Sequence, residues 1–354
     1  EHLQGMKPYE TTHPPLGKLL IALGISVFGM NPFGWRIVGT LIGVAMIPVI
    51  YVFAKRMFGR SEYAFLAGFL LTCDFMHFAQ TRIATIDVYG VFFIMLMYFF
   101  MYRYFTMSFY REPLKKTLVP LFWSGLFFGI GAASKWIVIY GGAGLALLFF
   151  LSLYVQYRQY RAAKAVLARP DDKHDARFLE RQRHIVRVFR PYALATLAWC
   201  VLFFVVIPAL IYSVSFLPYM AVPGEGYSLN NLWKYQLDMY NYHSKLVATH
   251  AFSSQWWEWP FIYKPIWYYS GQSLLPEGFV SSIVSMGNPA VWWAGAFAVI
   301  LSVLLCAKHR DRGLFVVLTA YFSQYIPWVL VSRFSFIYHY FAMVPFMILC
   351  IVYV

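Results

Sequence analysis

The sequence predicts an all-α protein that crosses a membrane several times. Hydrophobic residues make up 60% of the 354 residues and charged residues only 12%, a balance that a soluble domain does not carry on a wetted surface. Apolar stretches close to the roughly 20 residues needed to cross the hydrocarbon core recur along the chain. Most of the 29 Lys and Arg residues lie in every second connection between these stretches.

Nine stretches are predicted to be spanning helices, because a chain in lipid must satisfy its backbone hydrogen bonds internally. They cover residues 37–53, 63–79, 88–102, 118–133, 137–154, 192–217, 290–307, 314–331 and 336–354. The predicted organisation is an outer loop with an interfacial helix, a six-span region, an aromatic-rich outer loop and a three-span region, at 1–36, 37–217, 218–289 and 290–354. The chain begins in a polar loop and stops within an apolar helix, so we expect a fragment of a longer protein.

The basic residues predict the orientation. They cluster after the first, third, fifth and seventh spans, at 55–60, 103–116, 158–190 and 308–312. All four connections fall on one side, which the positive-inside rule makes cytoplasmic, and the largest of them is the loop 156–190. The net charge of +14 therefore reflects topology and does not indicate a nucleic-acid partner. We expect a multi-pass protein of the plasma membrane whose chemistry lies on the extracytoplasmic face.

A first polar group opens the chain at residues 13–18, where His13 and two prolines precede Lys18. Prolines begin a helix well, and the following apolar run, 19–30, is too short to span. It is expected to lie along the interface. A cation near a helix N-terminus is unfavourable, so Lys18 either has an anionic partner or snorkels from a turn.

Two further groups are expected at outer helix ends. Asp74 and His77 are three residues apart on one predicted helix, where they form either a site or a structural pair between helices. Arg82 and Asp87 follow in a tight turn, and Arg82 is preferred as a bidentate phosphate ligand. Lys135, in a short turn between spans, is either a phosphate ligand or an interfacial anchor.

The large outer loop is predicted to hold an amphipathic helix on the membrane surface. Its apolar and polar residues recur at helical spacing, at Leu229, Trp233, Tyr240, Ser244 and Val247. His243 and His250 are seven residues apart and are expected to share a face.

Aromatic side chains flank charged residues in the rest of this loop and in the last span. Tryptophans surround Glu258, which suits a sugar but is also typical of an interfacial belt. Arg333 and His339 open the last span, where they form either a phosphate or substrate site or, for His339, a packed core position.

The motifs that carry these groups, in this order, resemble those of the protein O-mannosyltransferases. They read HPPLGK at 13–18, NPFGWR at 31–36, QTRIATID at 80–87, SKW at 134–136, HAFSSQWWEWP at 250–260 and FIYHY at 336–340. These enzymes are polyprenyl-phosphate-sugar-dependent glycosyltransferases of the GT-C superfamily. The resemblance implies a GT-C-type helical bundle and transfer of mannose to a protein Ser or Thr hydroxyl, with inversion, on the extracytoplasmic face.

Two departures from the family pattern matter. The family's catalytic Asp-Glu pair precedes the HPPLGK segment, and nothing here matches it, so the catalytic residues are unknown and are expected upstream of residue 1. The outer loop has no room for the MIR domain of eukaryotic members, which indicates the bacterial type.

The resemblance and the charge pattern together suggest roles for particular residues. Donor phosphate ligands are expected at Arg82, Lys135, Arg333 and Lys18. Substrate or acceptor contacts are expected at His13, Asp87, His243, His250, Ser254, Trp256, Glu258 and His339. Membrane lipid, the polyprenyl-phosphate sugar and a secreted protein or glycan are the expected partners.

Other functions remain open at this point. No cofactor is expected beyond the donor, although a divalent ion on the upstream acids stays open. One alternative is sugar transfer to a glycan or lipid acceptor. Another is a secondary transporter, which would favour ionisable groups at the membrane midplane and two related halves.

Overall fold

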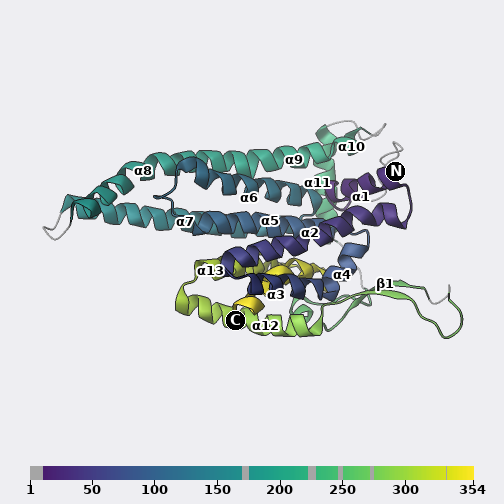
Figure 1. Ribbon diagram of the computed structural model, residues 1–354. Coiled ribbons are helices and arrows are strands. Elements are labelled where there is room, and N and C mark those ends of the chain that lie inside the picture. Colours follow the sequence, from purple (N-terminus) through teal and green to yellow (C-terminus); the bar gives the residue numbers. More distant parts are fainter. Residues whose placement is uncertain (1–10, 170–174, 222–228, 246–249, 272–274, 332) are drawn as a thin grey trace.

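The protein is a bundle of membrane-spanning helices. The computed structural model describes residues 11–169, 175–221, 229–245, 250–271, 275–331 and 333–354. Most of the helices run roughly side by side, and a two-stranded sheet projects from one end (Figure 1). Within the described residues, seven helical segments are long and apolar enough to cross a membrane: Pro32–Phe58, Asp87–Thr106, Leu114–Ser134, Ile137–Ala168, Ala176–Met220, Pro289–His309 and Arg312–Leu330. The predicted all-α, multi-span protein is confirmed.

In the first half of the chain, every regular element of the described residues is a helix. Its elements are α1 (Leu16–Phe28), α2 (Pro32–Phe58), α3 (Ser61–Thr72), α4 (Phe75–Arg82), α5 (Asp87–Thr106), α6 (Leu114–Ser134) and α7 (Ile137–Ala168). The spanning segment Ala176–Met220 is assembled from α8 (Ala176–Val201), a π-helical turn (Leu202–Val206), α9 (Ile207–Ser215) and α10 (Leu217–Met220).

The second half contains shorter elements and the only sheet of the described part of the chain. The helices are α11 (Leu229–Lys245), α12 (Pro289–His309), α13 (Arg312–Tyr325) and α14 (Val344–Tyr353), with 3₁₀ turns at Trp256–Phe261, Ile326–Leu330 and Ile337–Ala342. Strands β1 (Ile266–Ser270) and β2 (Ser282–Ser285) pair antiparallel, with Ile266 opposite Ser285. Nothing in the sequence pattern predicted this hairpin.

The basic connections gather at one end of the bundle, as the charge pattern predicts. The α2–α3, α5–α6, α7–α8 and α12–α13 connections lie at the left in Figure 1, and we call this the basic end. The helices α1 and α11 and strands β1 and β2 lie at the opposite end.

Two predicted spans are wrong as single helices. The stretch 63–79 breaks into α3 and α4, because the Asp74 carboxylate caps α4 by accepting a hydrogen bond from the His77 N–H at 2.9 Å. The same carboxylate accepts from Trp292 Nε1 of α12 at 2.7 Å, so Asp74 joins two helices and does not form a helix-face pair with His77. The stretch 336–354 begins as a 3₁₀ turn and becomes α-helical only at α14.

A short helix follows the two prolines, as predicted, and lies against the ends of the spans. Pro15 precedes the first turn of α1, and Gly17 is buried. A Cβ atom at Gly17 would come within 3.0 Å of Ile86 and 3.3 Å of the Ser134 carbonyl oxygen. The glycine of the HPPLGK segment therefore lets α1 approach the turns that precede α5 and α7.

Candidate functional site

A polar cavity of 310 Å³ lies at the end of the bundle opposite the basic end. The segment before α1, the α6–α7 turn, α11 and the chain between α13 and α14 all contribute to it. It is lined by His13, Lys135, Trp136, Ile137, Tyr140, His243, Ser244, Trp328, Leu330, Val331, Arg333 and His339. Five of the predicted site residues, far apart in sequence, therefore share one cavity: His13, Lys135, His243, Arg333 and His339.

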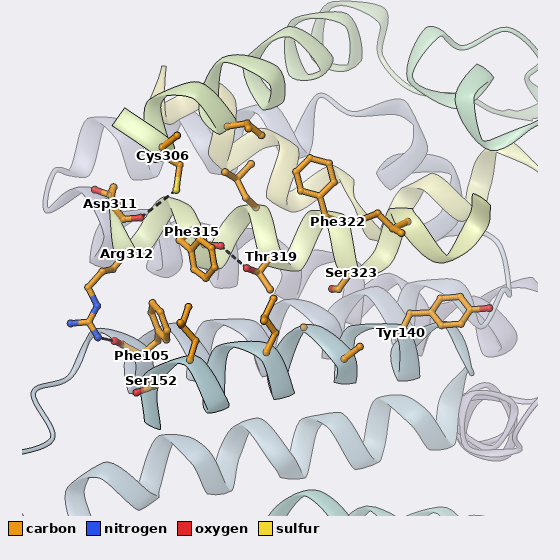
Figure 2. A pocket seen from close by; sticks show the side chains of 18 of the residues that line it. Phe105, Tyr140, Ser152, Cys306, Asp311, Arg312, Phe315, Thr319, Phe322 and Ser323 are labelled. Atoms are coloured by element: carbon orange, nitrogen blue, oxygen red, sulfur yellow. Dashed lines mark hydrogen bonds between the residues drawn. The ribbon is translucent and has the colours of Figure 1, made fainter. Parts of the chain in front are cut away.

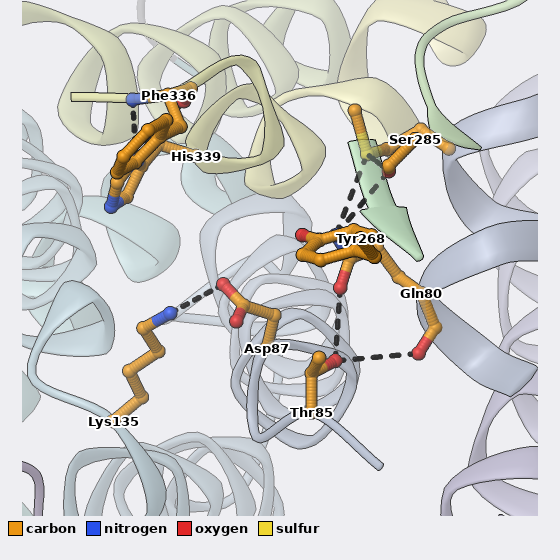
Figure 3. A network of polar contacts seen from close by, with 9 residues as sticks. Gln80, Thr85, Asp87, Lys135, Tyr268, Ser285, Phe336 and His339 are labelled. Atoms are coloured by element: carbon orange, nitrogen blue, oxygen red, sulfur yellow. Dashed lines mark hydrogen bonds and ion pairs between the residues drawn. The ribbon is translucent and has the colours of Figure 1, made fainter. Parts of the chain in front are cut away.

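The α6–α7 turn presents a buried cation to this cavity. α6 ends at Ser134 and α7 begins at Ile137, so Lys135 sits in the predicted two-residue turn. Its ammonium forms an ion pair with the carboxylate of Asp87, the first residue of α5 (Figure 3). The ring of Tyr338 faces the ammonium, with its centroid 5.4 Å from Nζ. Lys135 is thus a fixed charge held between two spans and an aromatic face.

A hydrogen-bonded group beside Asp87 ties the β-hairpin to α4. The Gln80 amide donates to the Tyr268 hydroxyl at 2.9 Å and to Ser285 Oγ at 3.4 Å, and the Thr85 hydroxyl donates to Gln80 Oε1 at 2.9 Å. Figure 3 shows this group on the far side of Asp87 from Lys135. Burial, and then the charge of Asp87, raise the pKa of the Tyr268 hydroxyl. Sequence reasoning assigned Tyr268 and Ser285 no role, and no local pattern links them to α4.

Two histidines form one wall of the polar cavity. The rings of His13 and His243 are 5.1 Å apart, and His243 Nε2 lies 2.8 Å from the carbonyl oxygen of Thr12. Burial lowers the pKa of His13 to about 2, with further lowering by the charges of Lys135, His243, Lys18 and Arg333. His13 is therefore a neutral imidazole at physiological pH.

The helix α11 is held in place by a short hydrogen-bond chain. Trp136 Nε1 donates to the Tyr212 hydroxyl at 2.9 Å, and that hydroxyl donates to Gln236 Oε1 at 2.6 Å. The α6–α7 turn, α9 and α11 are thereby connected, which positions His243. The predicted amphipathic helix is confirmed over 229–245, and Val247 lies outside the described residues.

His339 enters the cavity from an aromatic cluster. Its ring lies 4.2 Å from that of Trp328 and 4.4 Å from that of Tyr338, measured between centroids. Its Nδ1 is 3.0 Å from the Phe336 carbonyl oxygen. His339 is thus both packed like a core residue and part of the cavity wall.

The remaining loop candidates lie outside the lining of the polar cavity and hold the loop in place. Glu258 accepts a hydrogen bond from the Gln255 N–H at 2.7 Å and so caps the 3₁₀ turn Trp256–Phe261. The Ser254 N–H donates to the Ser335 carbonyl at 2.9 Å, and the Trp256 carbonyl accepts from the Tyr325 hydroxyl at 3.0 Å.

The expectation that His243 and His250 share a helix face is wrong. His250 is not helical, and its ring lies 5.1 Å from that of Phe336. His243 instead faces His13 and Trp136 from α11.

Arg82 and Lys18 also lie apart from the polar cavity. Arg82 ends α4 and lines a separate groove of 580 Å³ between α2 and α4, together with Arg36. Its guanidinium lies 4.8 Å from the ring centroid of Phe78. Lys18 Nζ is 3.5 Å from the hydroxyl of Tyr219 in α10. The four predicted phosphate ligands therefore occupy three places, and Lys135 and Arg333 share the polar cavity.

An apolar groove of 1180 Å³ runs along α7 and α13 (Figure 2), and Tyr140 lines both this groove and the polar cavity. Most of its lining is aliphatic or aromatic, and it reaches Phe105 and Arg312 at the basic end. Figure 2 shows Tyr140 at one end of the groove and Arg312 at the other. The two hollows are therefore neighbours, with Tyr140 in the wall of both.

Two family models match the chain in order. "Dolichyl-phosphate-mannose-protein mannosyltransferase" matches residues 12–168, and "C-terminal four TMM region of protein-O-mannosyltransferase" matches residues 228–354. The chain belongs to the protein O-mannosyltransferase family. The predicted resemblance is confirmed, and together these matches include every residue that lines the polar cavity.

Members of this family with assigned functions match over almost the whole chain. A polyprenol-phosphate-mannose–protein mannosyltransferase of Mycolicibacterium smegmatis is 24% identical, with 96% of this chain and 69% of the relative aligned. One from Corynebacterium glutamicum is 26% identical, with 95% and 69% aligned. The structure of the Saccharomyces cerevisiae protein O-mannosyltransferase Pmt1-Pmt2 complex bound to the sugar donor superimposes with a TM-score of 0.75 at 11% identity, covering 99% of this chain and 79% of that one. The mannosyltransferase chain therefore has the predicted GT-C fold.

Proposed function

We propose that this protein transfers mannose from a polyprenyl-phosphate carrier to a hydroxyl group of a protein. The observation that carries the proposal is the polar cavity that holds Lys135 and Arg333 and lies beside the apolar groove, with Tyr140 lining both. A polyprenyl phosphate has the matching shape, with one anionic head and a long apolar chain. The matched bacterial relatives are named as mannosyltransferases that use such a donor and a protein acceptor.

The donor phosphate is placed at Arg333 and Lys135. Cleavage of the sugar leaves a phosphate monoester with growing negative charge, which preorganised cations stabilise. The Lys135 ammonium is already paired with the Asp87 carboxylate, whereas Arg333 has no ion-pair partner within the described residues. Arg333 is therefore the cation more available to the phosphate, and the polyprenyl chain is placed along α7 and α13.

We further propose that the cavity lies on the extracytoplasmic face of the plasma membrane. The positive-inside rule supports this placement, because the basic connections all lie at the other end of the bundle. The acceptor would then be a secreted protein presented from outside the cell.

A carboxylate must accept the proton of the acceptor hydroxyl. Asp87 is engaged by Lys135, and Glu258 caps a 3₁₀ turn. Neither is therefore suited as the general base, and we assign that role, as the family resemblance implies, to a carboxylate outside the described residues.

We also propose that no cofactor is needed beyond the donor. The described residues include no group of three His, Cys, Asp or Glu side chains placed to hold a metal ion. A divalent ion on the general base is the alternative, and loss of transfer on adding EDTA, with rescue by Mg²⁺ or Mn²⁺, would establish it.

Transfer of labelled mannose from polyprenyl-phosphate mannose to a Ser/Thr-rich peptide, in membranes that contain the protein, tests the function. Arg333→Ala is expected to lower kcat/KM by roughly 10²-fold, the typical effect of removing one charge-stabilising group. Lys264→Ala removes an exposed cation outside the cavity lining and is the matched control. Full activity of the Arg333 variant would place the phosphate elsewhere.

Arg82→Ala separates the two possible phosphate sites. A loss confined to Arg82→Ala would move the phosphate to the groove that Arg82 shares with Arg36. Transfer to a glycan or lipid with none to the peptide would instead establish the alternative acceptor class.

A further inference from the structure

A second polar pocket, of 630 Å³, lies at the basic end between the α5–α6 connection and the α7–α8 hairpin. We call it the basic pocket. It is lined by Ser108, Tyr110, Arg111, Gln159, Ala162, Arg181, Gln182, His184 and Ile185. The α7–α8 hairpin that carries it extends to the far left in Figure 1, at the opposite end of the molecule from the polar cavity. The proposed sugar transfer assigns this pocket no role.

The walls of the basic pocket are fixed by their own small apolar core. Phe109 is buried beneath the pocket among residues of α7 and α8, and the core comprises Phe109, Tyr160, Ala163, Ile185, Phe189 and Ala193. The Tyr110 hydroxyl donates to the Gln156 carbonyl at 2.7 Å. His184 Nε2 lies 3.1 Å from the Tyr110 carbonyl, which can only accept, so the ring N–H donates. The α5–α6 connection is therefore hydrogen-bonded to both α7 and α8.

The described lining of the basic pocket carries positive charge and no negative charge. No carboxylate is among the described residues that line it. Within the described part of the chain, neither Arg111 nor Arg181 has an ion-pair partner, and the neighbouring Glu112 carboxylate pairs with Lys116 at 2.8 Å. Two guanidinium groups beside Ser and Gln side chains are suited to a phosphate, because a guanidinium binds its oxygens bidentately.

The depth of the basic pocket identifies the source of that phosphate. Gln159 lies about 22 residues after the start of α7, a rise of roughly 33 Å at about 1.5 Å per residue. The hydrocarbon core is about 30 Å thick, so the pocket lies at the head-group level of the leaflet on the basic side. Tyr154 and Tyr157 are exposed on α7 just before it, as expected for an interfacial aromatic belt.

We propose that the basic pocket binds the phosphate of an anionic phospholipid from this leaflet. Arg111 and Arg181 hold the phosphodiester, and the polar side chains of Ser108, Gln159 and Gln182 contact the head group. Basic pockets between helices on the cytoplasmic side are a recognised way of binding acidic lipids. The bound lipid would pin the α5–α6 connection and the α7–α8 hairpin at a defined depth.

Native mass spectrometry of the protein released from mixed phosphatidylglycerol and phosphatidylcholine nanodiscs tests this proposal. The wild type is expected to retain phosphatidylglycerol in preference to phosphatidylcholine. In the double variant Arg111→Gln/Arg181→Gln, the ratio of retained phosphatidylglycerol to phosphatidylcholine is expected to fall roughly 30-fold, from about 1 kcal/mol per arginine. The control Arg158→Gln/Arg177→Gln removes two exposed arginines of α7 and α8 that are outside the lining, and it is expected to keep the preference.

Three results would overturn the proposal. The first is a wild type with no preference for phosphatidylglycerol, and the second is a control pair that loses as much preference as the pocket pair. Displacement of the lipid by millimolar glycerol phosphate in detergent would show that the site prefers a soluble phosphate. All four exchanged arginines are exposed, and equal melting temperatures of the variants confirm that the fold is intact.

Discussion

Neutralising Asp87 alone is expected to destabilise the protein strongly, because it leaves the Lys135 ammonium buried without its partner. The side chains of Lys135 and Asp87 are only 8% and 12% exposed, so water replaces little of the lost interaction. The ring of Tyr338 faces the ammonium but carries no charge. Asp87→Asn keeps the shape of the side chain and removes only its charge.

The magnitude follows from the burial of the pair. Breaking a buried ion pair by removing one partner costs about 3–5 kcal/mol, because an uncompensated charge stays in a medium of low dielectric constant. Two unit charges 4 Å apart interact by about 4 kcal/mol at an effective dielectric constant of 20, which is the same range. Removing both charges with Asp87→Asn/Lys135→Met should restore most of that stability.

Reversible unfolding in mixed micelles, followed by circular dichroism, measures these differences. The two single variants, the double variant and the wild type form a cycle from which the coupling free energy is obtained. Donor binding adds an independent readout. If Lys135 contacts the phosphate, the double variant should bind polyprenyl-phosphate mannose more weakly than the wild type does, although its stability is restored. Wild-type stability of Asp87→Asn, or a double variant no better than the worse single variant, would refute the reasoning.

Three further predictions concern the groove, the cavity and the helix break. Ala143→Trp places an indole in the apolar groove and should raise KM for a long polyprenyl donor but not for a short-chain analogue, whereas Ala146→Trp, exposed on α7 outside the groove, should change neither. Because the folded-state pKa of His13 is lowered to about 2, only the unfolded state takes up its proton below pH 6.5, so stability should fall with acidification by about 2 kcal/mol from pH 6.5 to 5. The stability of His13→Gln, measured from melting curves, should therefore fall less between pH 6.5 and 5 than that of the wild type. The same fall in both proteins would contradict the lowered pKa of His13. Asp74→Ala removes the cap of α4 and the acceptor of Trp292 Nε1, and should cost about 3 kcal/mol in the same unfolding assay, with Asp74→Asn milder because it keeps one acceptor oxygen.

Most of the spans, and the gathering of the basic connections at one end of the bundle, were readable from the sequence alone. A stretch long enough to cross the hydrocarbon core must be helical whatever it packs against, and basic connections report the side on which they lie. The same holds for local features such as the start of α1 after two prolines and the short turn that carries Lys135. The break at Asp74 was missed, because a side-chain cap within an apolar stretch leaves its hydropathy almost unchanged.

Which polar groups meet was decided only by the tertiary structure. His13, Lys135, His243, Arg333 and His339 come from five segments and share one cavity, whereas Arg82, the cation that the sequence favoured, lines another groove. The hydrogen bond from Gln80 to Tyr268 links residues 188 positions apart, and no local periodicity encodes it. Span formation depends on each segment's own contact with lipid, but the site depends on how helices and loops pack against one another. The sequence therefore determined where the chain crosses the membrane, and packing determined which side chains meet in the polar cavity.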